Sequence, residues 1–113
     1  MESILETTKK LANITVGYDY FDTDVIIYIN QVFLTLKQLG VGPTDGFIIA
    51  DEVATWMEFL PDKPTLREST KAYMAQKVRL KFDPPANATM LQALQDSIAE
   101  YEFRALVEVE SGN

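Results

Sequence analysis

The sequence predicts an all-α fold, a small bundle of about four helices with one long loop at residues 40–64. Apolar residues recur at spacings of three and four along most of the chain, which is the period of a helix face. Glycine and proline gather between these stretches, where they interrupt helices. A chain of 113 residues, 47% of them hydrophobic, is long enough for one core, so we expect a single domain over residues 1–113.

A first helix is expected over residues 3–12, followed by a connection. Its apolar positions, Ile4, Leu5, Leu11 and Ala12, form a weak amphipathic pattern that ends near Asn13. Residues 15–22 mix turn formers with aromatic residues. We expect this connection to place Tyr18, Tyr20 or Phe21 against the core.

The second helix is predicted over residues 23–39, where a broad apolar face runs for 17 residues. Asp22 or Thr23 offers a side-chain oxygen to the free amides of the first turn, and Gly40 can end the helix. The many β-branched residues would also suit a strand, but the length and the stripe favour a helix. The apolar positions are Val25, Ile26, Ile29, Val32, Phe33, Leu36 and Leu39.

The loop at residues 40–64 begins with glycines and a proline and continues into a short apolar run at residues 47–50. One extended piece and a helix of one or two turns at residues 55–60 fit this stretch. A loop of this length inside a compact domain is typical of a segment that contacts a partner. Its aromatic residues Trp56 and Phe59 are either core residues or an exposed anchor for that partner.

Two long helices follow, over residues 65–82 and 88–109. The first has the pattern of a capping box at Thr65 and Glu68, and it stops at Phe82 because Pro84 and Pro85 follow Asp83. Asn87 is the expected cap of the second. The apolar stripes are Leu66, Tyr73, Met74, Val78 and Leu80 in the first helix, and Leu91, Leu94, Ile98, Tyr101 and Ala105 in the second. Phe103 and Leu106 lie off this seam and suggest a second buried face.

Composition excludes several kinds of chemistry. The chain has neither cysteine nor histidine, so disulfides, thiolate or imidazole catalysis and ordinary zinc sites are excluded, and we expect no cofactor. The cluster Asp19, Asp22 and Asp24 lacks the glycine and closing glutamate of a calcium loop and is interpreted as helix capping. Asp51, Glu52 and Glu58 carry no mark of a catalytic pair, and we expect no metal site and no enzymatic activity.

The ends and the hydropathy of the chain predict its compartment. The first ten residues carry acids where a signal peptide needs positive charge, and no stretch is apolar over the length of a membrane helix. We therefore expect no membrane association. The protein is expected in a cytoplasm, or in a particle assembled there.

The charges are distributed unevenly along an acidic chain of net charge -7. Residues 67–81 hold five bases and one acid, a net charge of +4, while residues 96–110 hold five acids and one base, a net charge of -4. Three interpretations remain: solvated faces with salt bridges between neighbouring helices, a charge register between subunits of an oligomer, or contact with DNA. The candidate interface residues are Arg67, Lys71, Lys77, Arg79, Lys81, Glu100, Glu102, Trp56 and Phe59.

An ordered series of short segments resembles the small head-tail connector, or adaptor, proteins of tailed bacteriophages and their prophages. The segments are Ile4-Leu5, residues 9–11, residues 21–27, residues 29–33, residues 38–43, residues 54–56 and residues 77–85. No single segment is diagnostic, whereas the series in this order, over residues 4–105, is specific.

The resemblance implies a helical bundle with a long loop and a structural role without catalytic residues or cofactors. It implies a ring of about a dozen copies under the phage portal, which extends the DNA channel and docks the next connector or tail-completion protein. The implied location is the head-tail junction of the virion, after assembly in the host bacterial cytoplasm, with genomic DNA passing without sequence specificity. The alternatives are a prophage-encoded DNA-binding regulator that uses residues 67–81, although no helix-turn-helix spacing supports it, and an enzyme accessory subunit.

Overall fold

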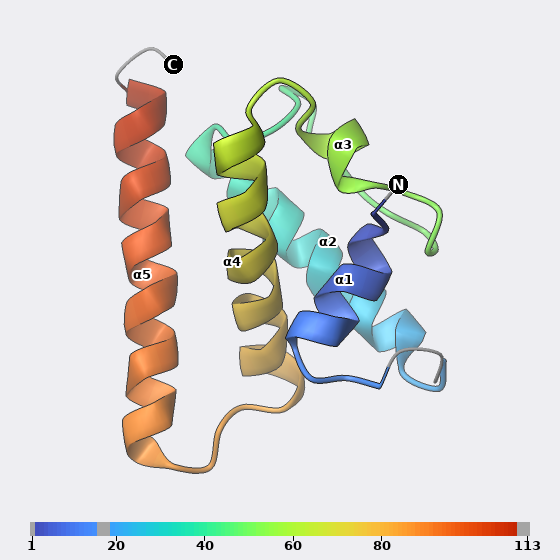
Figure 1. Ribbon diagram of the computed structural model, residues 1–113, viewed down its shortest axis with the longest axis vertical. Helices are drawn as coiled ribbons and strands as arrows, with labels where there is room; N and C mark the ends of the chain where they lie inside the picture. The colour runs from blue at the N-terminus through green and yellow to red at the C-terminus, as the bar shows by residue number, and fades with distance from the viewer. Residues whose placement is uncertain (1, 16–18, 111–113) are drawn as a thin grey trace.

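The computed structural model describes residues 2–15 and 19–110, and this part of the chain contains five helices and no strand (Figure 1). The helices are α1 (Ile4–Leu11), α2 (Asp22–Leu39), α3 (Trp56–Phe59), α4 (Pro64–Phe82) and α5 (Ala88–Glu110). Helix α3 is the short helix expected inside the long loop. The predicted all-α bundle is confirmed, and its long helices agree with the predicted ranges to within about one residue.

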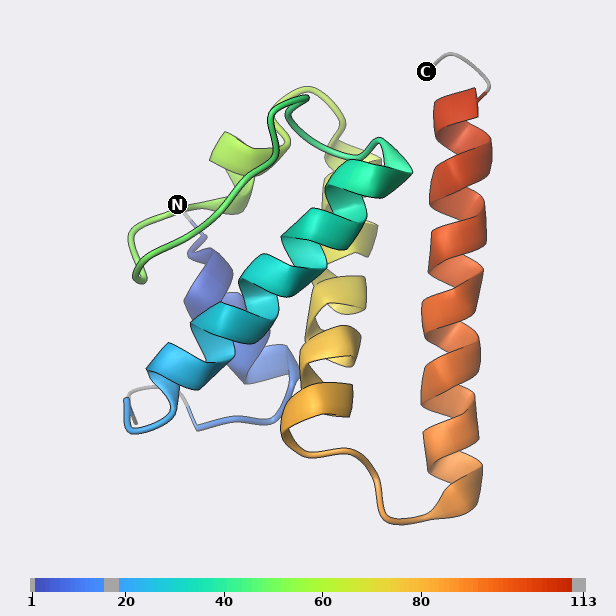
Figure 2. The ribbon, with the colours of Figure 1, turned by 180° about the vertical axis from the view of Figure 1, so that it is seen from behind.

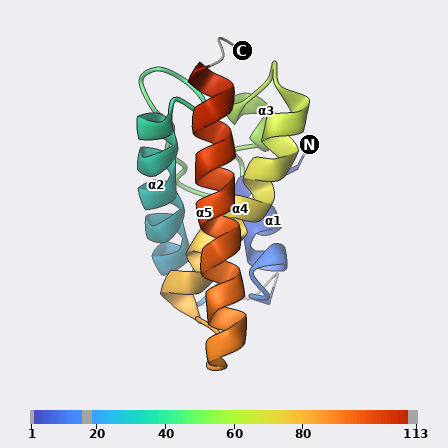
Figure 3. The same cartoon turned by 90° about the vertical axis from the view of Figure 1, so that its left-hand side faces the viewer.

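Helix α4 lies at the centre of the bundle and packs against α1, α2 and α5 (Figures 1 and 3). The molecule is flat, with extents of 40 × 35 × 19 Å. Helix α5 runs along one edge, and the loop between α2 and α3 reaches the opposite edge (Figures 1 and 2). None of the described helices is long and apolar enough to cross a membrane.

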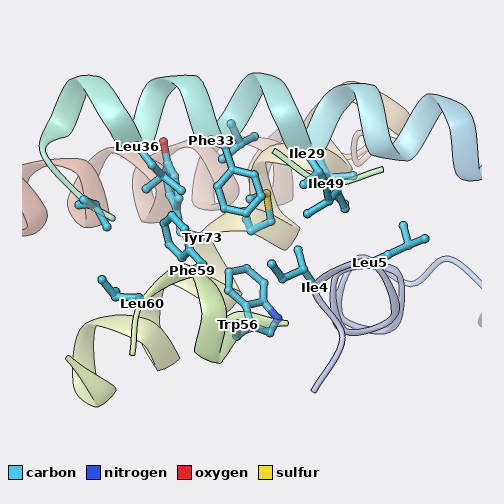
Figure 4. Close-up of a cluster of buried hydrophobic side chains, with 14 of the residues drawn as sticks. Ile4, Leu5, Ile29, Phe33, Leu36, Ile49, Trp56, Phe59, Leu60 and Tyr73 are labelled. Atoms are coloured by element: carbon cyan, nitrogen blue, oxygen red, sulfur yellow. The ribbon is translucent and has the colours of Figure 1, made fainter. Parts of the chain in front are cut away.

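The core is built around an aromatic cluster where α2, α3 and the long loop meet (Figure 4). The ring centroids of Phe33 and Phe59 are 4.8 Å apart, and Phe47 packs at 5.3 Å from Phe33. Trp56 and Ile4 bury their side chains beside them, so α1 and α3 share this core with α2. Each fully buried side chain of this size stabilises the fold by about 1.5–3 kcal/mol.

Helix α1 has defined caps at both ends. The Ser3 hydroxyl accepts a hydrogen bond from the Glu6 amide at 3.2 Å. At the other end Asn13 adopts a φ of 66°, and the Ile14 amide donates to the Lys9 carbonyl at 2.7 Å. A left-handed asparagine with this backward bond is a common way to end a helix, so the predicted end near Asn13 is confirmed.

The start of α2 differs from the prediction. Phe21 is the residue before the first turn, and neither Asp22 nor Thr23 caps it. The Asp22 carboxylate instead accepts from the ammonium group of Lys9 at 2.7 Å, and this lysine is only 1% exposed. A buried ammonium group needs a charged partner, so the ion pair takes the side chain that the sequence offers as a cap.

The connection before α2 is only partly as expected. Phe21 is half-buried and packs edge-to-face on Phe82, with centroids 5.1 Å apart. Tyr20 is exposed, and Tyr18 lies outside the described residues. At the far end of α2, Gly40 has a φ of 84° and ends the helix as predicted.

The long loop is fixed to the bundle at two points and then forms a local cap. The Asn30 side chain donates to the Ile49 carbonyl at 3.0 Å and accepts from the Ile49 amide at 2.9 Å. The Ile4 amide donates to the Ala54 carbonyl at 3.0 Å, which pairs the loop with the N-terminal segment as the one extended piece. Thr55 and Glu58 then form a capping box at the start of α3.

The capping box predicted at Thr65 and Glu68 is wrong. Helix α4 begins one residue earlier, at Pro64, after Lys63, and has no side-chain cap. Proline at the first position of a helix has the right φ and has no amide hydrogen to satisfy, so the helix can begin there without a cap. The Glu68 carboxylate is consequently free to pair with Lys71 at 2.7 Å.

Helix α5 begins as predicted, because the Asn87 side chain accepts from the amides of Thr89 and Met90 at 2.8 and 3.1 Å. Ile98 and Ala105 are buried against the bundle, and the other seam residues are half-buried. The predicted second buried face is wrong for this chain alone, since Phe103 is 68% exposed and Leu106 is 43% exposed.

We predict that Gly42→Ala lowers the free energy of unfolding by about 2–4 kcal/mol in urea denaturation. Gly42 has a φ of +92°, and an added Cβ would lie 2.8 Å from Cζ of Phe59 and closer still to Cε1. Gly46→Ala is the matched control, because its φ is +88° but its Cβ would meet only the flexible Lys37 side chain at 3.2 Å. The control should lose about 1–2 kcal/mol. Equal losses would contradict the packing of Gly42 against Phe59.

Candidate assembly interface

The candidate site is the charged surface around α4 and α5, which lie antiparallel (Figure 3). Tyr73 of α4 stacks on Tyr101 of α5, with centroids 4.1 Å apart and planes at 17°. The hydroxyl groups of Thr70 and Tyr101 are 2.6 Å apart. Since the Thr70 hydroxyl already donates to the Leu66 carbonyl at 2.6 Å, the Tyr101 phenol is the donor between them.

Polar contacts continue along the same helix pair. The Tyr73 phenol donates to Glu102 Oε2 at 2.7 Å, and the Lys77 ammonium group lies 3.7 Å from the same oxygen. One turn further on, Gln76 and Ser97 exchange hydrogen bonds at 2.9 and 3.2 Å. Besides the packing of Ile98 and Ala105, helix α5 is therefore held on α4 by hydrogen bonds whose partners meet only in this register.

Burial changes the ionisation of both stacked tyrosines. It raises the pKa of Tyr101 to about 12. Burial also raises the pKa of Tyr73, and the hydrogen bond to the Glu102 carboxylate raises it further, because a phenolate beside that charge is disfavoured. Both phenols are therefore neutral donors over the physiological range.

Three of the five candidate bases have partners within the chain. Arg67 donates to the Leu60 carbonyl at 2.9 Å and thereby ties the start of α4 to the end of α3. Lys71 pairs with Glu68 and with Glu2. The third is Lys77, which shares Glu102 with Tyr73. For these bases the interpretation as intramolecular salt bridges and hydrogen bonds is the one that the geometry favours.

The ion pair between Lys71 and Glu2 joins α4 to the N-terminal segment. The hydrogen bond from Lys71 lowers the pKa of Glu2. For Lys71, partial burial opposes the charged form, but the hydrogen bonds to Glu2 and Glu68 outweigh it, and the pKa of the ammonium group is raised. Both groups therefore stay charged at neutral pH.

Arg79 and Lys81 are the candidate bases without an ion pair to any residue in the described ranges 2–15 and 19–110. They lie in the last turn of α4, where positive charge also interacts favourably with the helix dipole. Glu100 is exposed and pairs with Arg104 on its own helix at 2.6 Å. Such an exposed pair contributes at most about 0.5 kcal/mol, so it does not commit Glu100 to this partner.

Trp56 and Phe59 are core residues, with exposures of 1% and 2%. In this conformation neither side chain can contact a partner, and the interpretation as core residues is the one the structure supports. The loop exposes other apolar side chains instead, namely those of Ile48 and Val53, which are 76% and 71% exposed. Residues 47–50 are all apolar, so no alternation in the sequence separates the exposed Ile48 from the buried Ile49.

The carboxylate groups considered for other chemistry have structural roles. Asp22 pairs with Lys9, and Glu58 belongs to the capping box of α3. Asp51 accepts from the Val53 amide at 2.9 Å and shapes the end of the loop. Among the residues that the structure describes, no group of acidic side chains is arranged to hold a metal ion.

We predict that the folded protein loses stability as the pH rises from 10 to about 12 and that Tyr101→Phe reduces this loss. The pKa of Tyr101 is raised from 10 to about 12 in the folded state, so between these pH values only the unfolded chain loses the phenol proton. The stabilisation is therefore complete below pH 10 and is lost as the pH rises to about 12. Urea denaturation at several alkaline pH values measures the slope. Tyr20→Phe, at an exposed position, is the control. A slope that is the same in the wild type and in Tyr101→Phe would contradict the burial of this phenol.

A comparison with protein families gives a match to a family described as "Phage connector protein" over residues 4–112. Searches of curated proteins and of solved structures give no significant match. The family match covers nearly the whole chain, from the first turn of α1 to beyond the end of α5. It agrees with the all-α bundle, which is the fold expected from the resemblance. The chain belongs to the phage connector protein family.

Proposed function

We propose that this protein is a structural subunit of the phage head-tail connector and acts as one helical domain. About a dozen copies form a ring under the portal, extend the DNA channel toward the tail and dock the next connector or tail-completion protein. The subunits are made in the host cytoplasm and end at the head-tail junction of the virion. The family match over residues 4–112 is the observation that carries this proposal.

The shape and the exposed surfaces support assembly. A ring of identical subunits needs two different surfaces that meet between neighbours. The flat molecule offers α5 at one edge and the long loop at the opposite edge (Figures 1 and 2). Near its C-terminal end α5 exposes Phe103, Leu106 and Val107 together, and a cluster of this kind is typical of a surface that is covered in an assembly.

The charge of the chain supports a conduit for DNA. A net charge of -7 gives the protein no general attraction to phosphate, so a lumen built from it would let the genome pass. The rival function, a DNA-binding regulator, needs the bases of residues 67–81 to face DNA. Arg67, Lys71 and Lys77 have partners within the chain, so the geometry does not favour that function.

Negative-stain electron microscopy of the purified protein with its portal tests the proposal. We expect an additional ring of density on one end of the portal. The control is the portal alone. If the protein leaves the portal unchanged, the connector function is contradicted, and a salt-sensitive gel shift with a defined DNA sequence would then support the regulator.

We predict that Arg79→Glu lowers the yield of assembled rings by about tenfold while it changes the melting temperature little. Arg79 has no ion pair within the described residues, so its charge is available to a neighbouring subunit or to the portal. Lys10→Glu makes the same change of charge at an exposed position on α1 and should assemble normally. An unaltered yield for Arg79→Glu would rule out a role of this charge in assembly.

A further inference from the structure

A small groove between α2 and α4 is lined by two lysines, by three side chains that carry a hydrogen-bond donor and by one valine. Its volume is about 150 Å³, and its lining residues are Tyr28, Gln31, Val32, Thr35, Lys77 and Lys81. The α2 residues follow one face of the helix, and the two lysines lie one turn apart on α4. None of these residues is acidic, although the chain as a whole carries a net charge of -7.

The positive charge of this α2–α4 groove is only partly neutralised by the chain itself. Lys81 is exposed and has no ion pair within the described residues. Lys77 lies 3.7 Å from Glu102, which is longer than a hydrogen bond, and Tyr73 holds the same oxygen at 2.7 Å. The groove therefore has room and charge for one more carboxylate or phosphate group.

The tip of the long loop, residues 48–53, has the complementary character. Asp51 and Glu52 are exposed at its end, and Glu52 has no ion pair with any described residue. The apolar side chains of Ile48 and Val53 flank them and are also exposed. The tip thus presents two negative charges between two apolar side chains.

The loop tip is held in place from its base. Asn30 binds both backbone groups of Ile49, and the Ala54 carbonyl accepts from the Ile4 amide. Phe47, next to the tip, packs against Phe33 and Phe59. A rigid base that presents an exposed tip reduces the entropy lost on binding, which is typical of a recognition loop.

The tip and the groove cannot pair within one chain. Asn30 holds the loop on one side of α2, whereas Tyr28 and Thr35 line the groove from a different face of the same helix. The groove lies on the part of α4 that contacts α5 through Lys77, and the loop reaches the edge of the molecule opposite α5 (Figures 1 and 2). Two complementary surfaces on separate parts of a subunit are what a heterologous interface requires.

We infer that the loop tip of one copy docks into the α2–α4 groove of the next, with Glu52 facing Lys81 and Lys77. This inference rests on the proposed ring and names the surfaces that close it. A carboxylate from a second copy is favoured over a DNA phosphate, because the loop tip offers exposed acidic groups flanked by exposed apolar side chains, whereas the acidic chain as a whole has no general attraction to phosphate. Ile48 and Val53 lose their exposure to water in the same contact.

Charge reversal tests the pairing in the full-length protein with its portal. Glu52→Lys and Lys81→Glu should each lower the yield of rings by about tenfold, and the double variant with both changes should restore it. Asp62→Lys makes the same change of charge at an exposed loop residue outside the tip, and its yield should equal that of the wild type. Circular dichroism establishes that each variant is folded.

Disulfide cross-linking gives a second, independent readout. The natural chain has no cysteine, so Glu52→Cys with Lys81→Cys introduces only two thiols. Mild oxidation of assembled protein should give a ladder of covalent oligomers on a non-reducing gel. Glu52→Cys with Lys10→Cys is the control and should stay monomeric on that gel.

The outcomes separate this inference from the proposed function. If wild-type rings form but the charge swap gives no rescue and the cysteine pair gives no ladder, the interface is wrong and the connector function stands. If Lys81→Glu leaves assembly intact and instead weakens salt-sensitive DNA binding, the groove holds phosphate and the inference is overturned. If the wild type forms no ring with the portal, the proposed function fails and the inference fails with it.

Discussion

The burial of α4 on three sides is the constraint on which this structure depends. Tyr73, Met74 and Val78 face the core, so α1, α2 and α5 must all pack around one helix. The cations of α4 lie between these buried positions, and burial next to neighbouring helices gives them partners. Arg67 binds a backbone carbonyl, while Lys71 and Lys77 bind carboxylate groups of other segments. Several bases of α4 thereby connect this helix to the neighbouring segments of the bundle.

The same constraint leaves charge available at one end of α4. Arg79 and Lys81, in its last turn, have no ion pair within the described residues. Along one basic stretch, Arg67 and Lys71 are bound within the chain, Lys77 has only a longer contact to Glu102, and Arg79 and Lys81 have no ion pair within the described residues. The proposed assembly uses the charges at this end of α4. Because exposed pairs contribute little to stability, these charges can select a neighbour at small cost to folding.

Much of the fold could be predicted from the sequence, because the residues that begin and end the helices act on their immediate neighbours in the chain. Gly40 and the proline pair after Asp83 act through their own backbone, and Asn87 acts through a side chain that bonds to the next turn. Each of them ends or begins a helix where expected. The two misses have different causes. The Asp22 carboxylate does not cap α2, because it pairs with Lys9, 13 residues earlier in the chain. The capping box at Thr65 and Glu68 does not form, because α4 begins one residue earlier, at Pro64.

The candidate site was less predictable, because it depends on contacts between residues that are distant in the chain. The sequence identifies the bases of α4, but the packing of α5 and the N-terminal segment decides which of them have a carboxylate partner within the chain. Likewise, the groove is formed by residues of α2 and α4 that are far apart in the sequence, and no local pattern predicts that they meet. The exposure of Phe103 contradicts a buried second face in the single chain and becomes understandable if the subunit is covered in an assembly.

Native mass spectrometry of a mixture with the portal tests whether this 12.8 kDa chain assembles there as a structural subunit. We expect one dominant complex whose mass exceeds that of the portal by a fixed whole number of subunits, about a dozen. A spectrum that contains only free portal and monomeric or dimeric protein at saturating concentration would contradict it.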